Sequence, residues 1–215
     1  MLKLVLLWGG WCALHSLLIT TTVRRWIEGK GGRWLGLYRL IYIGVAIGTL
    51  VPLMWYTALL PQQPLGAPPL WLGGVQGLLL VYALIMFVGG LRVYDLQTFL
   101  GLRQWRHYRQ GTLSPPPVLN TEGILRYLRH PWYSGGIALL WGLPALTDVT
   151  LVTRSILTVY LVVGAFLEQR KMQQLLGESY QQYCRRTPMF IPWRLWRAVR
   201  PDPGSGPASG KNSPR

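Results

Sequence analysis

Residues 70–91 read LWLGGVQGLLLVYALIMFVGGL, an apolar stretch that contains no charged residue. An α-helix rises 1.5 Å per residue and the hydrocarbon core of a bilayer is about 30 Å thick, so this stretch is long enough to cross a membrane. Residues 38–60 form a second stretch of this kind, in which the only charge is Arg39, at the edge. The two stretches predict an all-α, polytopic membrane helix bundle.

Three further apolar stretches bring the expected number of transmembrane segments to about five. Residues 4–23 end at Arg24 and Arg25, and we expect a membrane anchor rather than a signal peptide, because no cleavage site of small residues precedes the arginines. Residues 135–147 and 151–167 are short and are separated by little more than Asp148. We therefore expect them to form a tight helical hairpin, followed by a C-terminal helix on the cytoplasmic side.

Proline, glycine and serine dominate the end of the chain. Residues 201–215 read PDPGSGPASGKNSPR, a composition that cannot bury an apolar core. We therefore expect one membrane domain, residues 1–200, followed by a disordered cytoplasmic tail, residues 201–215.

Charges in the chain are few and mostly positive. The chain has 22 Lys and Arg against 7 Asp and Glu, a net charge of +15, yet only 13% of its residues are charged, whereas soluble proteins average about 25%. Of the 22 basic residues, 20 fall on one side of the five segments, which by the positive-inside rule places the N-terminus outside and the C-terminus in the cytoplasm. In a prokaryote the membrane would be the inner one. Because these charges are spread over short juxtamembrane loops, we expect contacts with membrane lipids rather than with nucleic acid.

Polar groups inside apolar stretches are costly and are therefore candidates for function. His15, followed by Ser16, is the ionisable residue within residues 4–23. We expect a neutral histidine that is hydrogen-bonded to a neighbouring helix, and a role in a functional site is the alternative. Cys12 and Cys184 are far apart in the sequence and predict neither a disulfide framework nor a metal site.

A second group of polar residues flanks the expected hairpin. Residues 129–136 read RHPWYSGG, in which a proline and two glycines can begin a helix with free backbone N–H groups. Residues 168–183 read EQRKMQQLLGESYQQY. They begin with the Glu168 carboxylate and two basic residues and end with Tyr180 and Tyr183, which lie on one helical face. These groups could bind an amphipathic cofactor such as S-adenosylmethionine. Arg, Trp and Tyr at this depth also anchor helices in lipid headgroups, and the residue types alone favour that alternative.

The order and spacing of these motifs are those of a known group of membrane enzymes. RHPWYSGG, followed after the hairpin by E-Q-R-x(4)-L-L-G-x-x-Y-x-x-Y-x(4)-P-x-x-I-P, resembles the C-terminal signature of the isoprenylcysteine carboxyl methyltransferase and phospholipid methyltransferase group, over residues 122–192. Residues 95–104, DLQTFLGLRQ, together with His15 and Ser16, resemble the branch that contains NnrU-type proteins and methanethiol S-methyltransferases.

The resemblance implies a membrane methyltransferase that uses S-adenosylmethionine, without a metal, and that methylates a small thiol or a lipid-soluble acceptor. The implied cofactor-binding residues are His130, Tyr133, Gly135, Glu168, Tyr180 and Tyr183. The implied catalytic residues are Arg129, Arg170 and Glu168, and these arginines, with Arg103, would lower the pKa of a thiol acceptor. Family members often carry a second glutamate where this chain has Gln169. The alternative is a non-catalytic NnrU-like membrane protein with a role in transport or assembly.

Overall fold

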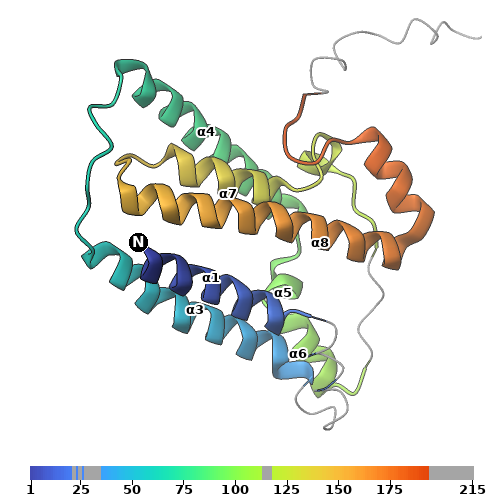
Figure 1. Cartoon of the computed structure of the whole chain (residues 1–215). Helices are drawn as coiled ribbons and strands as arrows, with labels where there is room; N and C mark the ends of the chain where they lie inside the picture. Colours follow the sequence, from blue (N-terminus) through green and yellow to red (C-terminus); the bar gives the residue numbers. More distant parts are fainter. Residues whose placement is uncertain (21–22, 24–25, 27–34, 113–117, 194–215) are drawn as a thin grey trace, which may run out of the picture.

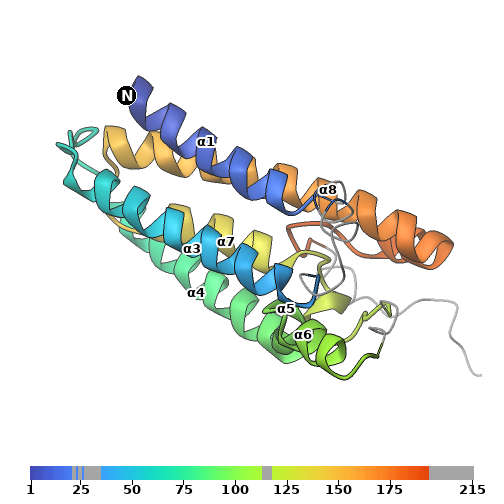
Figure 2. The same cartoon turned by 90° about the horizontal axis from the view of Figure 1, so that it is seen from below.

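The computed structural model describes residues 1–20, 23, 26, 35–112 and 118–193, and within them the fold is all-α. Figure 1 shows the described helices and Figure 2 the same helices from below. In chain order they are α1 (Leu2–Leu18), α3 (Leu35–Leu59), α4 (Leu70–Val93), α5 (Leu96–Phe99), α6 (Leu102–Arg109), the 3-10 helix η1 (Gly123–Arg126), α7 (Pro131–Gly142) and α8 (Asp148–Arg186). The predicted end of the first stretch, Arg24 and Arg25, and the predicted tail, residues 201–215, lie outside the described residues.

The long helices run side by side in one bundle (Figures 1 and 2). α1 packs against α3 and α8, α7 packs against α4 and α8, and the short helix α6 packs against α3. At one end of the bundle the loop between α3 and α4 contacts the start of α8. There the backbone N–H of Asp148 donates to the Gln63 carbonyl oxygen at 3.0 Å. The opposite end carries α5, α6, η1 and the last turns of α8.

Three of the described helices, α3, α4 and α8, are long and apolar enough to cross a membrane. Their exposed surfaces carry apolar side chains such as Ile47, Leu78 and Val159, a surface that suits lipid better than water. α1 is a shorter apolar helix of 17 residues. α7, with 12 residues, is about 18 Å long, which is less than the thickness of the hydrocarbon core. The all-α prediction is therefore confirmed, with three candidate spans and a shorter apolar helix at the N-terminus.

The predicted hairpin is confirmed, but the helix after it begins later than Glu168. α7 ends at Gly142, the turn occupies residues 143–147, and Thr147 caps α8 by accepting a hydrogen bond from the Thr150 N–H. Arg154, which is buried, donates to the Pro144 carbonyl oxygen at 2.7 Å and so holds the turn. α8 runs without a break past Glu168 as far as Gly177, whose φ and ψ are not helical. The residues from there to Arg186 form a second helical piece that runs in another direction (Figure 1).

Glycines let α4 and α7 pack closely, and this contact places the start of α7. A Cβ atom at Gly90 would lie 2.0 Å from the Trp132 ring, and one at Gly142 would lie 3.0 Å from the Leu80 side chain. Small residues at a helix contact allow close approach of the backbones, as is common inside membranes. The Trp132 ring is thereby held on α4, where its indole N–H donates to the Phe87 carbonyl oxygen.

Candidate functional site

The candidate site lies where α7 begins and where α8 extends past the bundle. His130 is the N-cap of α7 and Pro131 takes the first helical position. After α8 the chain folds back onto this start: the backbone N–H of Arg129 donates to Pro188 at 2.9 Å, and that of His130 donates to Met189 at 3.2 Å. Segments that are about 60 residues apart in sequence are therefore joined at one place.

Arg129 connects the start of α7 with both parts of α8. Its Nη1 donates to the Gln169 side-chain oxygen, before the kink, and lies 2.7 Å from the Cys184 sulfur, after the kink. The same guanidinium lies within hydrogen-bonding reach of the Tyr180 hydroxyl. Among the described residues its Nε atom is buried without a partner, so one donor remains available.

Tyr133 and Glu168 form the acidic part of the site. The Tyr133 ring packs over Gly164, where a Cβ atom would lie 3.2 Å from the ring. Gly164 and Glu168 are one helical turn apart on α8. This places the Tyr133 hydroxyl within hydrogen-bonding reach of the Glu168 carboxylate, near the positive charges of Lys171 and Arg39.

His130 lies between these groups and is buried, with 4% of its surface exposed. Its ring meets the edge of Tyr133 at a centroid distance of 5.5 Å, and in the described part of the chain its Nε2 atom has no hydrogen-bond partner. Burial, reinforced by the positive charge of Arg129, lowers the pKa of His130 to about 4. His130 is therefore a neutral imidazole at physiological pH, with a free ring nitrogen in the site.

Tyr180 and Tyr183 close the site from the last turns of α8. Both are buried, and their ring centroids are 5.9 Å apart. The Tyr183 hydroxyl donates to the Leu125 carbonyl oxygen at 2.6 Å, which ties α8 to η1. The structure therefore brings together most of the residues that the sequence predicted for the site: Arg129, His130, Tyr133, Glu168, Tyr180 and Tyr183.

Three of the predicted residues lie elsewhere. Gly135 faces α4, where a Cβ atom would lie 2.9 Å from that of Met86, so its role is in packing. Arg170 is exposed, and its side chain has no partner among the described residues. Residues two apart on a helix point in different directions, and it is Glu168 that lies near Tyr133. Arg103 pairs with Asp95 at 2.9 Å, and hydrogen bonds from Thr98, with this arginine, hold the pKa of Asp95 below its usual value.

Sequence reasoning missed two residues that face the site. Tyr94, the C-cap of α4, makes an edge-to-face contact with the Trp132 ring at a centroid distance of 4.8 Å, and it lies close enough to Glu168 for the carboxylate charge to act on it. Arg39, on α3, donates from Nε to the Phe99 carbonyl oxygen at 2.6 Å, and its positive charge also interacts with the Glu168 carboxylate. Both residues lie at the edge of a predicted apolar segment, and this position in the sequence could have marked them as candidates for the site.

A separate polar cluster lies deeper in the bundle. The His15 ring forms hydrogen bonds with the Tyr42 hydroxyl of α3 and the Tyr160 hydroxyl of α8. The expectation of a histidine hydrogen-bonded to neighbouring helices is confirmed. The cluster joins α1, α3 and α8 inside the apolar part of the bundle.

Together, this fold and site define a class: a helical membrane protein with a polar, aromatic-lined site at the end of its bundle. The chain belongs to the NnrU family, whose sequence profile, described as NnrU protein, matches residues 3–199.

The chain is similar to methanethiol S-methyltransferases and to Nurim. Methanethiol S-methyltransferase 1 of Bradyrhizobium diazoefficiens is 31% identical over 163 residues, which are 73% of this chain and 55% of that protein. Methanethiol S-methyltransferase of Mycobacterium tuberculosis is 26% identical over 200 residues, 89% of this chain and 77% of that protein. Nurim of Sus scrofa is 30% identical over 187 residues, 82% of this chain and 68% of that protein. The chain spans about half the length of several of the methyltransferases, and no solved structure matches it.

Proposed function

We propose that this chain is an integral-membrane methyltransferase that uses S-adenosylmethionine to methylate a small thiol or a lipid-soluble acceptor. The observation that carries the proposal is the convergence of Arg129, Tyr133 and Glu168 on one site at the end of the bundle. Relatives named methanethiol S-methyltransferase, at 26 to 31% identity, support the reaction class.

The described residues fit the charged groups of the cofactor. A guanidinium with a free donor, Arg129, suits the carboxylate of S-adenosylmethionine, and the Glu168 carboxylate suits its ammonium group. The ring faces of Tyr133 and Tyr180 suit the sulfonium cation. His130 adds a buried acceptor nitrogen without a partner among the described residues, which suits a donor group of the ligand.

Methyl transfer at this site needs positioning more than proton chemistry. Bound there, S-adenosylmethionine supplies a methyl group on a positively charged sulfur that leaves as a neutral thioether. Arg129 and Glu168 would fix the orientation of the two reactants, and the buried rings around them would exclude water. If the acceptor is a thiol, the positive charge of Arg129 favours its thiolate, the nucleophilic form.

The site would face the cytoplasm, where the cofactor is made. Described basic residues of the connecting segments, such as Arg103, Arg109 and Arg126, lie at the end of the bundle that carries the site, and the positive-inside rule assigns this end to the cytoplasm. The N-terminus would then lie outside, with α1 and the α7–α8 hairpin completing five membrane segments. We expect membrane lipids as neighbours and neither a metal nor nucleic acid as a partner.

Cofactor binding tests the proposal directly. The protein, purified in lipid nanodiscs, should bind S-adenosylmethionine in isothermal titration calorimetry, and Glu168→Gln should weaken binding by about tenfold or more, since a charged hydrogen bond contributes about 1.5–3 kcal/mol. Glu178→Gln, which removes an exposed carboxylate from the same helix, is the matched control and should bind like the wild type. The rate of transfer of a labelled methyl group to methanethiol should likewise be lower for Glu168→Gln than for the wild type and Glu178→Gln.

Failure to bind would favour the alternative. If the wild type in nanodiscs binds no S-adenosylmethionine, the enzyme assignment is wrong, and a non-catalytic role in transport or assembly takes its place. Binding without transfer to any thiol or lipid fraction would keep the cofactor site and reject the proposed acceptors.

A further inference from the structure

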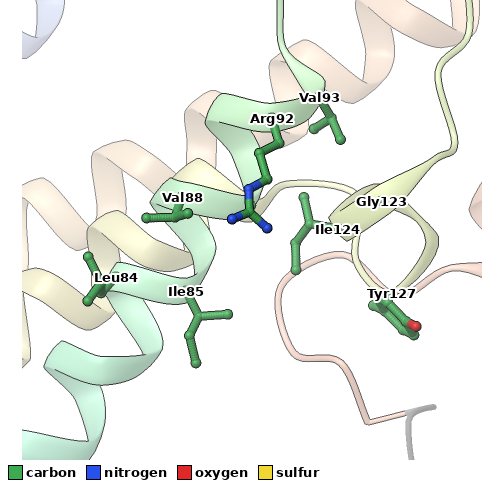
Figure 3. Close-up of a pocket in the computed structure, with 9 residues that line it drawn as sticks. Leu84, Ile85, Val88, Arg92, Val93, Gly123, Ile124 and Tyr127 are labelled. Atoms are coloured by element: carbon green, nitrogen blue, oxygen red, sulfur yellow. The ribbon is translucent and has the colours of Figure 1, made fainter.

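A groove on the outside of α4 lies apart from the candidate methyl-transfer site. It has a volume of about 510 Å³ and lies between α4 and η1. Figure 3 shows its lining, with Leu84, Ile85 and Val88 on α4 and Ile124 and Tyr127 on the η1 side. The lining is mostly apolar, with the Tyr127 hydroxyl on the η1 side and the one charged side chain, Arg92, at one end.

The groove forms on the face of α4 that the bundle does not use. Ala83, Met86 and Gly90 are buried, and Gly90 meets the Trp132 side chain of α7. Leu84 and Ile85 point the other way and remain exposed. These exposed residues belong to a helix that is long and apolar enough to cross a membrane, so their natural surroundings are lipid chains.

Gly89 explains why η1 can form the second wall. A Cβ atom at this position would lie 3.0 Å from the Cβ atom of Ile124, so a larger residue would push η1 away from α4. Gly123, which begins η1, has a φ of 54°, a left-handed conformation that glycine adopts without strain. The groove is therefore a consequence of two glycines.

Arg92 is the charged residue of the groove. It lies in the last turn of α4, one turn beyond Val88, and its side chain is exposed. Figure 3 shows its guanidinium between the α4 side chains and Ile124. It has no hydrogen-bond or ion-pair partner among the described residues, and the groove lining contains no acidic residue. An unpaired cation therefore stands at the end of an apolar groove, where the helix leaves the apolar layer.

We propose that this groove binds an anionic phospholipid, with an acyl chain along Leu84, Ile85 and Val88 and the phosphate on Arg92. The charge of Arg92 complements an anionic headgroup, and an arginine at the end of a membrane helix is where such headgroups are held. The volume is within the range of small-molecule sites. The proposal rests on α4 crossing the membrane and is independent of methyl transfer.

Native mass spectrometry of the detergent-purified protein tests this site. The probes are phosphatidylglycerol and phosphatidylcholine with identical acyl chains. The wild type should retain phosphatidylglycerol in preference, and Arg92→Gln should bind it about fivefold more weakly, because one arginine near a headgroup contributes about this factor. The matched control is Arg106→Gln, which removes an exposed arginine from α6, outside the groove. It should retain the lipid as the wild type does.

A second variant fills the groove and leaves its charge in place. Val88→Trp should reduce retention of the lipid by a similar factor, with helix content and S-adenosylmethionine binding unchanged. If Arg92→Gln does not fold, the result with Val88→Trp decides. Equal retention of phosphatidylglycerol by the wild type and the folded variants would overturn the proposal. So would displacement of the lipid by inorganic phosphate alone, because the acyl chain would then contribute nothing.

Discussion

Arg129 is the residue at which the elements of the candidate site meet. Its backbone is tied to Pro188 and its guanidinium to Gln169 and Cys184. Because the Gln169 amide is neutral, the charge of Arg129 is not cancelled by a carboxylate in this contact. A glutamate at position 169, common in the family that the motif resembles, would cancel part of it. The glutamine therefore leaves more positive charge for an anionic group of a ligand.

The Arg129–Gln169 contact gives a prediction for stability. Gln169→Glu should raise the free energy of unfolding by about 1 kcal/mol, because a charge-assisted hydrogen bond is stronger than a neutral one. Gln169→Leu should lower it by about 1–3 kcal/mol, because a guanidinium donor loses its partner. Thermal unfolding of the two variants in one detergent checks the order. If the leucine variant is as stable as the glutamate variant, the contact does not form.

His130 gives a prediction for pH dependence. Its folded-state pKa of about 4 lies below the ordinary value of 6.5. Below pH 6.5 the unfolded chain therefore takes up a proton that the folded protein does not, and stability falls as the pH falls toward 4. Between pH 7 and pH 5 this residue should cost about 2 kcal/mol. The measurement is the unfolding free energy of the wild type and His130→Gln at both pH values. The variant should lose less stability on acidification, whereas parallel losses would contradict the buried, neutral imidazole.

Residue types and spacing identified most of the candidate site but not the direction of each side chain. Arg129, Tyr133 and Glu168 could be predicted because their motifs match a known pattern. Gly135 belongs to the same motif, yet it faces Met86 on a helix that is 50 residues earlier in the sequence. Its role depends on a helix contact that spacing alone does not reveal.

Among the elements, α8 shows how one residue can redirect a long helix. Gly177 has φ 58° and ψ −131°, a conformation reserved for glycine, and no heavy atom lies within 4 Å of the position a Cβ atom would take. Another residue at position 177 would therefore be strained by its backbone conformation and not by a clash of its side chain. The kink aims the last turns of α8, with Tyr180 and Tyr183, back toward η1 and the start of α7.

Replacing the glycine at the kink should therefore be costly. Gly177→Ala should lower the free energy of unfolding by about 1–3 kcal/mol, the usual cost of a strained backbone conformation. Gly48→Ala is the matched control, since this position in α3 also has no neighbour within 4 Å but has ordinary helical geometry. The control should be unchanged or up to about 1 kcal/mol more stable. Equilibrium unfolding in detergent compares the two, and equal effects would mean that the kink is not required.

The long helices could be predicted from the sequence because apolar length is a direct consequence of membrane thickness. α3 and α4 lie within a few residues of the predicted stretches, 38–60 and 70–91. The continuity of α8 could not be predicted in this way, because a change from apolar to polar residues at Glu168 alters the surroundings of a helix without ending it. Backbone hydrogen bonds continue through such a boundary, and only Gly177 interrupts them.

On the scale of the whole molecule, the two ends of the bundle differ in chemistry. One end is closed by short turns that are tied together, since the Gln62 side chain accepts from the Thr147 hydroxyl at 2.6 Å and the Gln63 backbone donates to Asp148. The other end carries the Arg129 site. The basic residues of α6 and those that end α8, Arg185 and Arg186, lie at this second end. The charge excess and the candidate site therefore point to the same side of the membrane.

This asymmetry predicts how the protein is oriented. In a background of Cys12→Ala and Cys184→Ala, Ala67→Cys lies in the exposed loop between α3 and α4, and Gln110→Cys lies in the exposed residues after α6. A membrane-impermeant maleimide added to intact cells should label position 67, whereas position 110 should be labelled only after the membrane is opened, because positively charged segments remain in the cytoplasm. The reverse pattern would place the Arg129 site outside the cell, away from the cytoplasmic supply of S-adenosylmethionine. That labelling pattern would contradict the proposed methyl transfer, which needs the site on the cytoplasmic side, and it would not contradict the fold.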